Sequence, residues 1–231
     1  MSSLGLKVVL HAAAAAIMAY GYGNIKYTPA DAWIRQQKGG HSQFLTILGL
    51  GIAWLTMILS LVSDFVPAIK AVRWLKRTLL MVAMPVSFVI SSIYWSMLIF
   101  VPEKILMPVR GASAFTPEQG VPSSSTSVPQ LYRIPLSMDL ALHAVPAISL
   151  LLDFALFERK YTKKQAFIGG LLACAAAGTS YGYWVEYLAT FNGTFPYPFL
   201  TDNPPHIRQL IYAGASSGAL VMFWILNALH P

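Results

Sequence analysis

Residues 44–65 read FLTILGLGIAWLTMILSLVSDF, a run of 22 residues in which Asp64, near its end, is the one charged residue. At 1.5 Å per residue, a helix of this length extends about 33 Å, enough to cross the ~30 Å hydrocarbon core of a bilayer. A helix satisfies its own backbone hydrogen bonds, so such a segment is stable in lipid without polar cover. The stretch therefore predicts a transmembrane helix.

Five further apolar runs of 19 to 24 residues accompany it. The six predicted spans are Leu4–Tyr22, Phe44–Phe65, Thr78–Phe100, Leu136–Phe157, Gln165–Leu188 and Ile207–Leu229. The first run lacks a strongly basic start and leads into a basic loop, which favours a retained span over a signal peptide. We expect an all-α fold, a six-transmembrane-helix bundle that forms one membrane domain over residues 1–231.

The composition argues against a soluble protein and against a nucleic-acid partner. Hydrophobic residues make up 56% of the chain and charged residues 11%, about half the charged fraction of an average soluble domain. The formal net charge is +7, but the basic residues gather between the apolar runs, where membrane topology accounts for them. The single cysteine, Cys174, allows no intrachain disulfide.

The distribution of lysine and arginine predicts the orientation of the spans. The N-terminus and the second and fourth loops carry nine basic residues in short segments, whereas the other three loops carry seven spread over longer ones. The positive-inside rule then places both termini in the cytosol. The third loop, residues 101–135, is rich in proline and serine around Gly120–Pro129, and we expect it to be a long mobile lumenal loop.

Polar side chains inside a bilayer cost free energy unless they have partners, so each one is a candidate for function. The predicted orientation brings a group of them to one layer near the lumenal leaflet. These residues are Thr46, Trp95, Asp139, His143, Tyr183, Trp184 and Glu186. On the cytosolic side we interpret His11 as an isolated, packed histidine, and Asp64 and Asp153 as structural partners of the basic loops.

Thr46, His143 and Asp139 together suggest a hydrolytic site. A threonine hydroxyl becomes a good nucleophile when a base removes its proton, and imidazole is the usual base. Asp139 precedes His143 by four residues, so both project from one helix face, and the carboxylate can orient the ring. The alternative is that Asp139 and His143 bridge helices for packing and that Thr46 merely begins its helix. Spacing alone leaves both interpretations open.

The chain is similar to the androgen-induced gene 1 family, which includes the androgen-dependent tissue-factor-pathway-inhibitor-regulating protein and many fungal relatives. The resembling segments are Gly39-Gly40-x-x-x-Phe44-Leu45-Thr46, Ser63-Asp64, Tyr94-Trp95, His143-x-x-Pro146, Gly182-Tyr183-Trp184-Val185-Glu186 and Gly193-x-x-x-Tyr197-Pro198-Phe199-Leu200. Their order and spacing agree with the family over nearly the whole chain, as does the six-span layout, and the chain resembles a fungal-type member.

This resemblance implies a multi-pass membrane hydrolase that cleaves fatty acid esters of hydroxy fatty acids. By position, the threonine nucleophile of the family is Thr46 and its histidine is His143. Similar animal proteins carry asparagine where this chain has Asp139, so an orienting role for Asp139 is inferred from this sequence alone. Their third loop is also shorter, which bears on the identity of the substrate more than on the type of reaction.

The predicted substrate is a lipid ester that enters from the bilayer, without metal or cofactor; protein partners are not indicated. The rival interpretation is a non-enzymatic multi-pass lipid-binding or transport protein, although the internal symmetry of transporters is not visible. A haem-binding electron carrier would need paired histidines at one depth, but His11 and His143 lie at opposite levels. The resemblance places the protein in the endoplasmic reticulum, another endomembrane or the plasma membrane.

Overall fold

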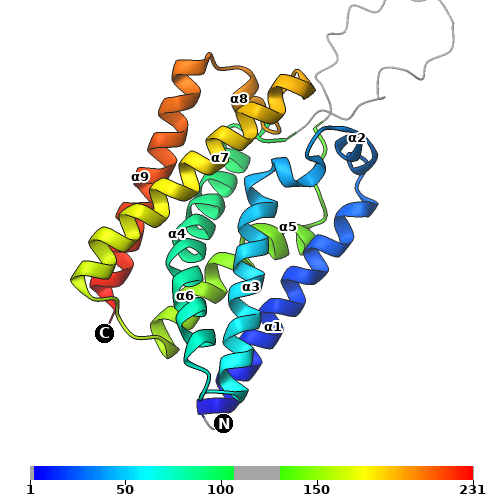
Figure 1. Cartoon of the computed structure of the whole chain (residues 1–231). Coiled ribbons are helices and arrows are strands. Elements are labelled where there is room, and N and C mark those ends of the chain that lie inside the picture. The colour runs from blue at the N-terminus through cyan, green and yellow to red at the C-terminus, as the bar shows by residue number, and fades with distance from the viewer. Residues whose placement is uncertain (1–2, 107–130, 231) are drawn as a thin grey trace, which may run out of the picture.

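The structure of the chain, a computed structural model, describes residues 3–106 and 131–230 (Figure 1). The long helices and the bent pair are α1 (Ser3–Asn24), α3 (Leu45–Phe65), α4 (Lys70–Phe100), α5 (Leu136–His143), α6 (Val145–Phe157), α7 (Gly170–Asn192) and α9 (Pro205–Leu229). The short elements are η1 (Ile25–Tyr27), α2 (Asp31–Gln36), η2 (Gly40–Gln43), η3 (Pro102–Lys104), η4 (Gln165–Gly169) and α8 (Pro198–Thr201). The predicted all-α fold is confirmed.

The helices lie side by side, with the two marked ends of the chain at one end of the bundle and α2 and α8 at the other (Figure 1). Helix α3 packs between α1 and α4, while α4 also contacts α6, α7 and α9. Part of the predicted 101–135 loop, residues 107–130, lies outside the described residues.

Helix α4 begins at Lys70, eight residues before the predicted start at Thr78. The basic residues that we expected in a loop therefore occupy its first turns. Lys76 in this segment is buried, and its ammonium group lies 2.8 Å from a Glu158 oxygen and 3.1 Å from an Asp153 oxygen. Because these carboxylates replace water as its partners, the helix can extend inward through a charged residue.

The fourth predicted span is bent rather than straight. Helices α5 and α6 meet at Ala144 with an angle of 43°. Pro146, the second residue of α6, has no N–H with which to continue the helical hydrogen-bond pattern, and its ring crowds the preceding turn. The bend places His143 at the end of α5, next to the break.

Within residues 3–106 and 131–230, four helices are long and apolar enough to cross a membrane, namely α1 with its extension through Tyr27, α3, α4 and α9. The bent α5–α6 pair is a fifth if it is counted as one span. Helix α7 is long enough at 23 residues but falls short in apolarity, because its second half carries Tyr181, Tyr183, Trp184 and Glu186. Six spans and cytosolic termini therefore stay predictions.

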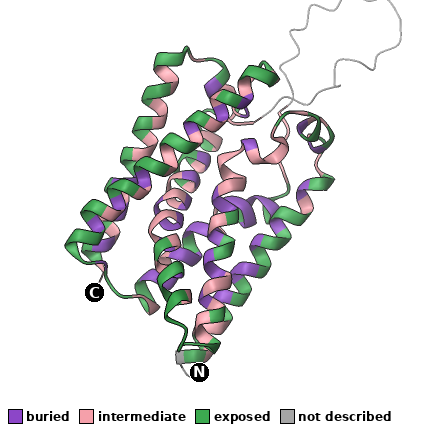
Figure 2. Cartoon of the chain, in the orientation of Figure 1, coloured by how far each residue is buried: buried purple, intermediate pink, exposed green. Residues whose placement is uncertain are grey.

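Buried residues gather between the helices and exposed ones on their outer faces (Figure 2), and large apolar side chains occur in both places, as expected of a bundle in lipid. The main core cluster joins α1, α3, α4, α5 and α6 and includes Met18, Met57, Leu80, Leu150 and Phe154. Leu172, Leu210 and Ile99 are among the large apolar side chains that face outward. In lipid these residues need no polar cover, as predicted from the composition.

Helices α7 and α9 approach closely through a small residue. A methyl group at Gly178 would collide with the Ser216 side chain of α9. Glycine is suited to this point because small residues let helix backbones approach in membranes. Ser216 donates its hydroxyl hydrogen bond back to the Tyr212 carbonyl at 2.7 Å, so its polar atom is satisfied within its own helix.

Candidate active site

A cavity of about 790 Å³ lies in the half of the bundle that contains α2 and α8. Its wall comes from the N-terminal half of α3, the C-terminal half of α4, and from α5, α7 and α9. Both described ends of the 101–135 segment also contribute, through Ile105, Leu106, Tyr132 and Ile134. The lining is mostly apolar, and the volume falls within the range of about 300–1,000 Å³ that small-molecule sites occupy.

Thr46 lies on this wall, in the first turn of α3. The turn before it is fixed from α7, because the Trp184 indole donates to the Ser42 carbonyl at 3.0 Å and the Tyr181 hydroxyl donates to the Gln43 carbonyl at 3.2 Å. Gly39, with φ of 85°, starts this turn in the left-handed region that favours glycine. Thr46 is thus held in place by distant parts of the chain.

Tyr197, on the connection between α7 and α8, reaches the same helix start. Its phenol oxygen accepts a hydrogen bond from the Thr46 backbone N–H at 3.5 Å. Its ring packs edge-on against Phe44, with centroids 5.6 Å apart, and stacks on Phe199 at 5.3 Å. Tyr197 belongs to one of the resembling segments, but its spacing in the sequence does not indicate that it contacts Thr46.

His143 is fixed from two sides. Its Nδ1 lies 2.8 Å from an Asp139 oxygen, and its ring stacks on Tyr94 with centroids 3.5 Å apart and planes 5° apart. The His143 side chain is 8% exposed and that of Asp139 is fully buried. The second Asp139 oxygen has no hydrogen-bond partner among the described residues, and the Nε of the Arg133 guanidinium lies 3.8 Å from it.

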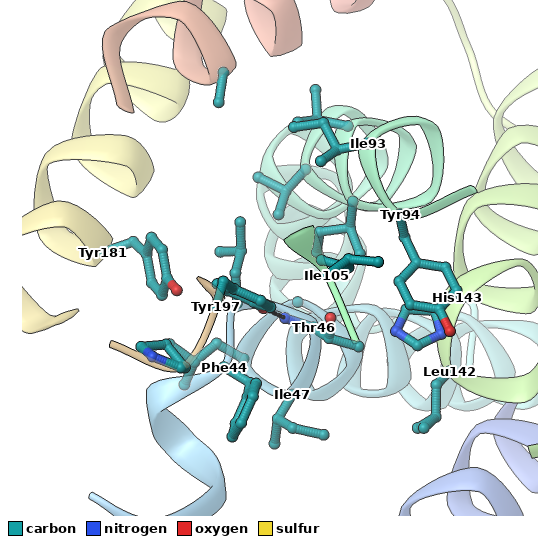
Figure 3. A pocket seen from close by; sticks show the side chains of 18 of the residues that line it. Phe44, Thr46, Ile47, Ile93, Tyr94, Ile105, Leu142, His143, Tyr181 and Tyr197 are labelled. Carbon is teal, nitrogen blue, oxygen red and sulfur yellow. Dashed lines mark hydrogen bonds between the residues drawn. The ribbon is translucent and has the colours of Figure 1, made fainter. Parts of the chain in front are cut away.

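The cavity brings Thr46 and His143 to one space, although they are 97 residues apart in sequence. In Figure 3 the Thr46 side chain lies between Tyr197 and the stacked pair of Tyr94 and His143. Among the described residues, no hydrogen bond joins Thr46 to the His143 ring. With Nδ1 directed at Asp139, the other ring nitrogen, Nε2, is left without a protein partner in that part of the chain.

Several other residues of the predicted polar layer do not line the cavity. Tyr183 is 75% exposed and points away from the bundle. Glu186 forms an ion pair with Arg208 of α9, with distances of 2.6 and 2.7 Å, and accepts a hydrogen bond from Tyr212 at 3.1 Å. The ion pair of Glu186 and Arg208 joins α7 to α9. Trp95 contacts the Tyr94 ring edge-on. Of the predicted layer, Thr46, His143 and Trp184 line the cavity.

The prediction that His11 is isolated is wrong. Its Nδ1 lies 2.6 Å from an Asp64 oxygen and its Nε2 lies 2.9 Å from an Asp153 oxygen. Asp153 in turn pairs with Lys76, as expected of a partner of the basic segment, whereas Asp64 pairs with His11. The partners of His11 are 53 and 142 residues away in sequence, so no local pattern indicated them.

A third histidine–aspartate pair was also missed. His41 lies on the cavity wall, and its Nε2 is 2.7 Å from an Asp31 oxygen. Arg35 lies 3.5 Å from the other oxygen of the same carboxylate. Among the described residues, no cluster of three or more histidine, cysteine, aspartate or glutamate side chains is arranged to hold a metal ion.

Comparison with known proteins gives one family and one curated relative. A family model described as FAR-17a/AIG1-like protein matches residues 6–231. A UPF0641 membrane protein of Schizosaccharomyces pombe is 28% identical over 224 residues, which cover 96% of this chain and 89% of the relative. No solved structure matches the chain.

Proposed function

The chain belongs to the FAR-17a/AIG1-like family of membrane proteins, and we propose that it is an intramembrane hydrolase of lipid esters with Thr46 as nucleophile and His143 as base. The observation that carries this proposal is the shared cavity, whose wall holds a threonine hydroxyl and an aspartate-bound histidine. The resemblance noted in the sequence further favours fatty acid esters of hydroxy fatty acids as the substrates.

The hydrogen bond between His143 and Asp139 supports a base at Nε2. An ionised carboxylate can only accept, so the proton of the neutral ring resides on Nδ1 and the lone pair on Nε2. Stacking on Tyr94 restricts rotation of the ring. No hydrogen bond connects His143 to Thr46 among the described residues, so the mechanism requires the two groups to come within reach when substrate binds, as is common for catalytic contacts.

The reaction follows from these positions. His143 takes the hydroxyl proton as the Thr46 oxygen attacks the ester carbonyl, and the alkoxide of the hydroxy acid leaves with that proton. Water then attacks the threonyl ester, gives one proton through His143 back to Thr46, and releases the fatty acid. The apolar wall of the cavity accommodates the acyl chains, since hydrocarbon gains free energy by leaving water.

An activity probe that reacts with hydrolase nucleophiles tests the proposal. Thr46→Ala and His143→Ala should each lose probe labelling, and ester hydrolysis should fall by more than about 10³-fold, because residues of such a unit act together. Thr56→Ala is the matched control. Thr56 is in the same helix but is buried away from the cavity, with its hydroxyl bonded to the Ile52 carbonyl. Equal labelling and hydrolysis by all variants would refute the proposal.

The alternative is a non-enzymatic protein that binds or transports lipid in the same cavity. It is favoured by the absence of a hydrogen bond between Thr46 and His143 among the described residues, together with the apolar wall. This function predicts saturable lipid binding without hydrolysis, and it predicts that Thr46→Ala binds lipid as the wild type does while neither protein releases fatty acid.

A further inference from the structure

The phenol groups of Tyr181 and Tyr197 both contact the start of α3, but Tyr181 acts there as a hydrogen-bond donor and Tyr197 as an acceptor. The Tyr181 hydroxyl donates to the Gln43 carbonyl at 3.2 Å, so its proton is used in fixing the turn before Thr46. The Tyr197 oxygen accepts from the Thr46 N–H instead, and no backbone carbonyl of the described chain accepts its proton. The phenol also contacts the Thr46 side chain and the Tyr181 phenol, so its proton lies among neutral hydroxyl oxygens. An oxyanion formed where Thr46 attacks would draw the Tyr197 hydrogen bond away from these neutral oxygens.

The surroundings of Tyr197 keep that donor protonated. Burial raises the pKa of the Tyr197 phenol, although contacts from Thr46 and from the Leu45 backbone act in the opposite direction. The group is thus an O–H at neutral pH. Packing against Phe44 and Phe199 fixes the ring, so the hydroxyl position is set before substrate arrives.

The location also suits negative charge. The first turn of a helix carries partial positive charge, and α3 begins at Leu45, directly before Thr46. When the Thr46 oxygen adds to an ester carbonyl, the carbonyl oxygen becomes an anion bonded to the same carbon atom as the Thr46 oxygen. A donor that already touches the Thr46 amide lies at the right end of the helix to meet it.

We propose that the Tyr197 hydroxyl is the oxyanion donor of the site, a role that rests on the proposed threonine hydrolase function. As the carbon–oxygen bond to Thr46 forms, the carbonyl electron pair moves to oxygen, and the threonine proton passes to His143. Tyr197 donates a hydrogen bond to the anion and keeps its own proton. When the intermediate collapses, the pair returns to re-form the carbonyl and the alkoxide leaves with the proton from His143.

The test compares Tyr197→Phe with Tyr181→Phe, because each removes one phenol hydroxyl from the start of α3. Removal of a single oxyanion donor lowers kcat by about 10²–10³-fold. We expect that loss in Tyr197→Phe with KM changed little. Tyr181→Phe loses one hydrogen bond that positions Thr46, so it should lower kcat by less than about tenfold and weaken the ketone much less than Tyr197→Phe does. A long-chain trifluoromethyl ketone, which forms an anionic adduct with the nucleophile, should bind Tyr197→Phe at least about 10²-fold more weakly. A non-hydrolysable ether analogue should bind equally.

Equal kcat in Tyr197→Phe and wild type would overturn the role of Tyr197, as would equal weakening of the ketone and the ether. If Tyr197→Phe does not fold, a fluorinated tyrosine at position 197 keeps the ring and makes the phenol more acidic. The alkaline limb of its kcat profile should then move to lower pH, and an unmoved profile would refute the role. Absence of hydrolysis by the wild type, or full activity in Thr46→Ala, would instead refute the proposed function itself.

Discussion

His143 and His11 are both bonded to aspartate inside the bundle, but they use their rings differently. One ring nitrogen of His143 is hydrogen-bonded to Asp139, and the residue borders the cavity. Both ring nitrogens of His11 are hydrogen-bonded, to Asp64 and Asp153, and the residue is fully buried. A histidine can act as a base only if one nitrogen is free and can reach a substrate, so the number of bonded nitrogens separates the two roles.

The His11 site is better described as a charge cluster that connects helices. It includes three basic groups, His11, Lys76 and Arg77, and three carboxylates, Asp64, Asp153 and Glu158. The cluster joins α1, α3, α4 and the end of α6.

The largest effect that would sharpen this comparison is the loss of His11. His11→Ala should lower the free energy of unfolding by about 3–5 kcal/mol, because the partly buried Asp64 loses its partner and the buried Asp153 keeps only Lys76. Chemical unfolding in detergent, followed by tryptophan fluorescence, measures the change. Hydrolysis per folded molecule should stay within about twofold of wild type.

The opposite result would break the comparison. If His11→Ala stayed as stable as wild type while its folded fraction lost hydrolysis, the cluster would take part in function and His143 would not be the distinguishing histidine. His143→Ala is the matched variant. It should lower the free energy of unfolding less than His11→Ala does, because its site borders a cavity that can relax or take up water.

A smaller effect is expected from Asp139→Asn. The amide oxygen can still accept from Nδ1, but it lacks the charge that stabilises the imidazolium formed during the reaction. We expect a drop in kcat of about 10²-fold, less than the ~10⁴-fold that a wrong tautomer costs a hydrolytic triad.

Asp31→Asn is the control for that substitution, because Asp31 holds His41 at the same cavity. Its kcat should change by no more than about twofold. A greater loss in Asp31→Asn than in Asp139→Asn would transfer the role of base from His143 to His41.

The smallest effect concerns the exposed pair of Lys104 and Asp202, which are 2.8 Å apart. The hydrogen bond to Asp202 raises the pKa of Lys104, so the ammonium is charged and the pair is present at neutral pH. The contribution of this shift is lost as the pH rises above the ordinary lysine value. Exposed pairs contribute little, so Lys104→Ala should leave the Tm of unfolding unchanged within error. A clear drop in Tm would mean that charge pairs matter here without burial.

The sequence predicted the helices well and the tertiary contacts poorly. Apolar runs determine where the chain can lie in lipid. Five of the six predicted spans therefore begin and end within four residues of the observed helices, counting η4 with α7 and α5 with α6. The start of α4 was misplaced because Lys76 resembles a loop residue until its carboxylate partners are known. The bend at Ala144 follows from Pro146, which was noted only as part of a motif.

The candidate site likewise contains residues that the sequence predicted and residues that only the structure revealed. Thr46, His143 and Asp139 were proposed from residue type, spacing and resemblance, and the structure places the first two on one cavity wall. Tyr94 and Tyr197 gained roles only from packing, since their partners are far away in sequence. Long-range contacts of this kind leave no periodic signal in one chain.

The break between α5 and α6 also bears on hydration. In a continuous helix the N–H of residue 146 would bond to the carbonyl of Leu142, but Pro146 has no such hydrogen. Leu142 lines the cavity and directly precedes His143. A carbonyl without its helical donor is a natural binding point for a water molecule, and release of an acyl group from threonine consumes one. Pro146 thus leaves a polar backbone group next to His143, at a point where the proposed reaction would need water.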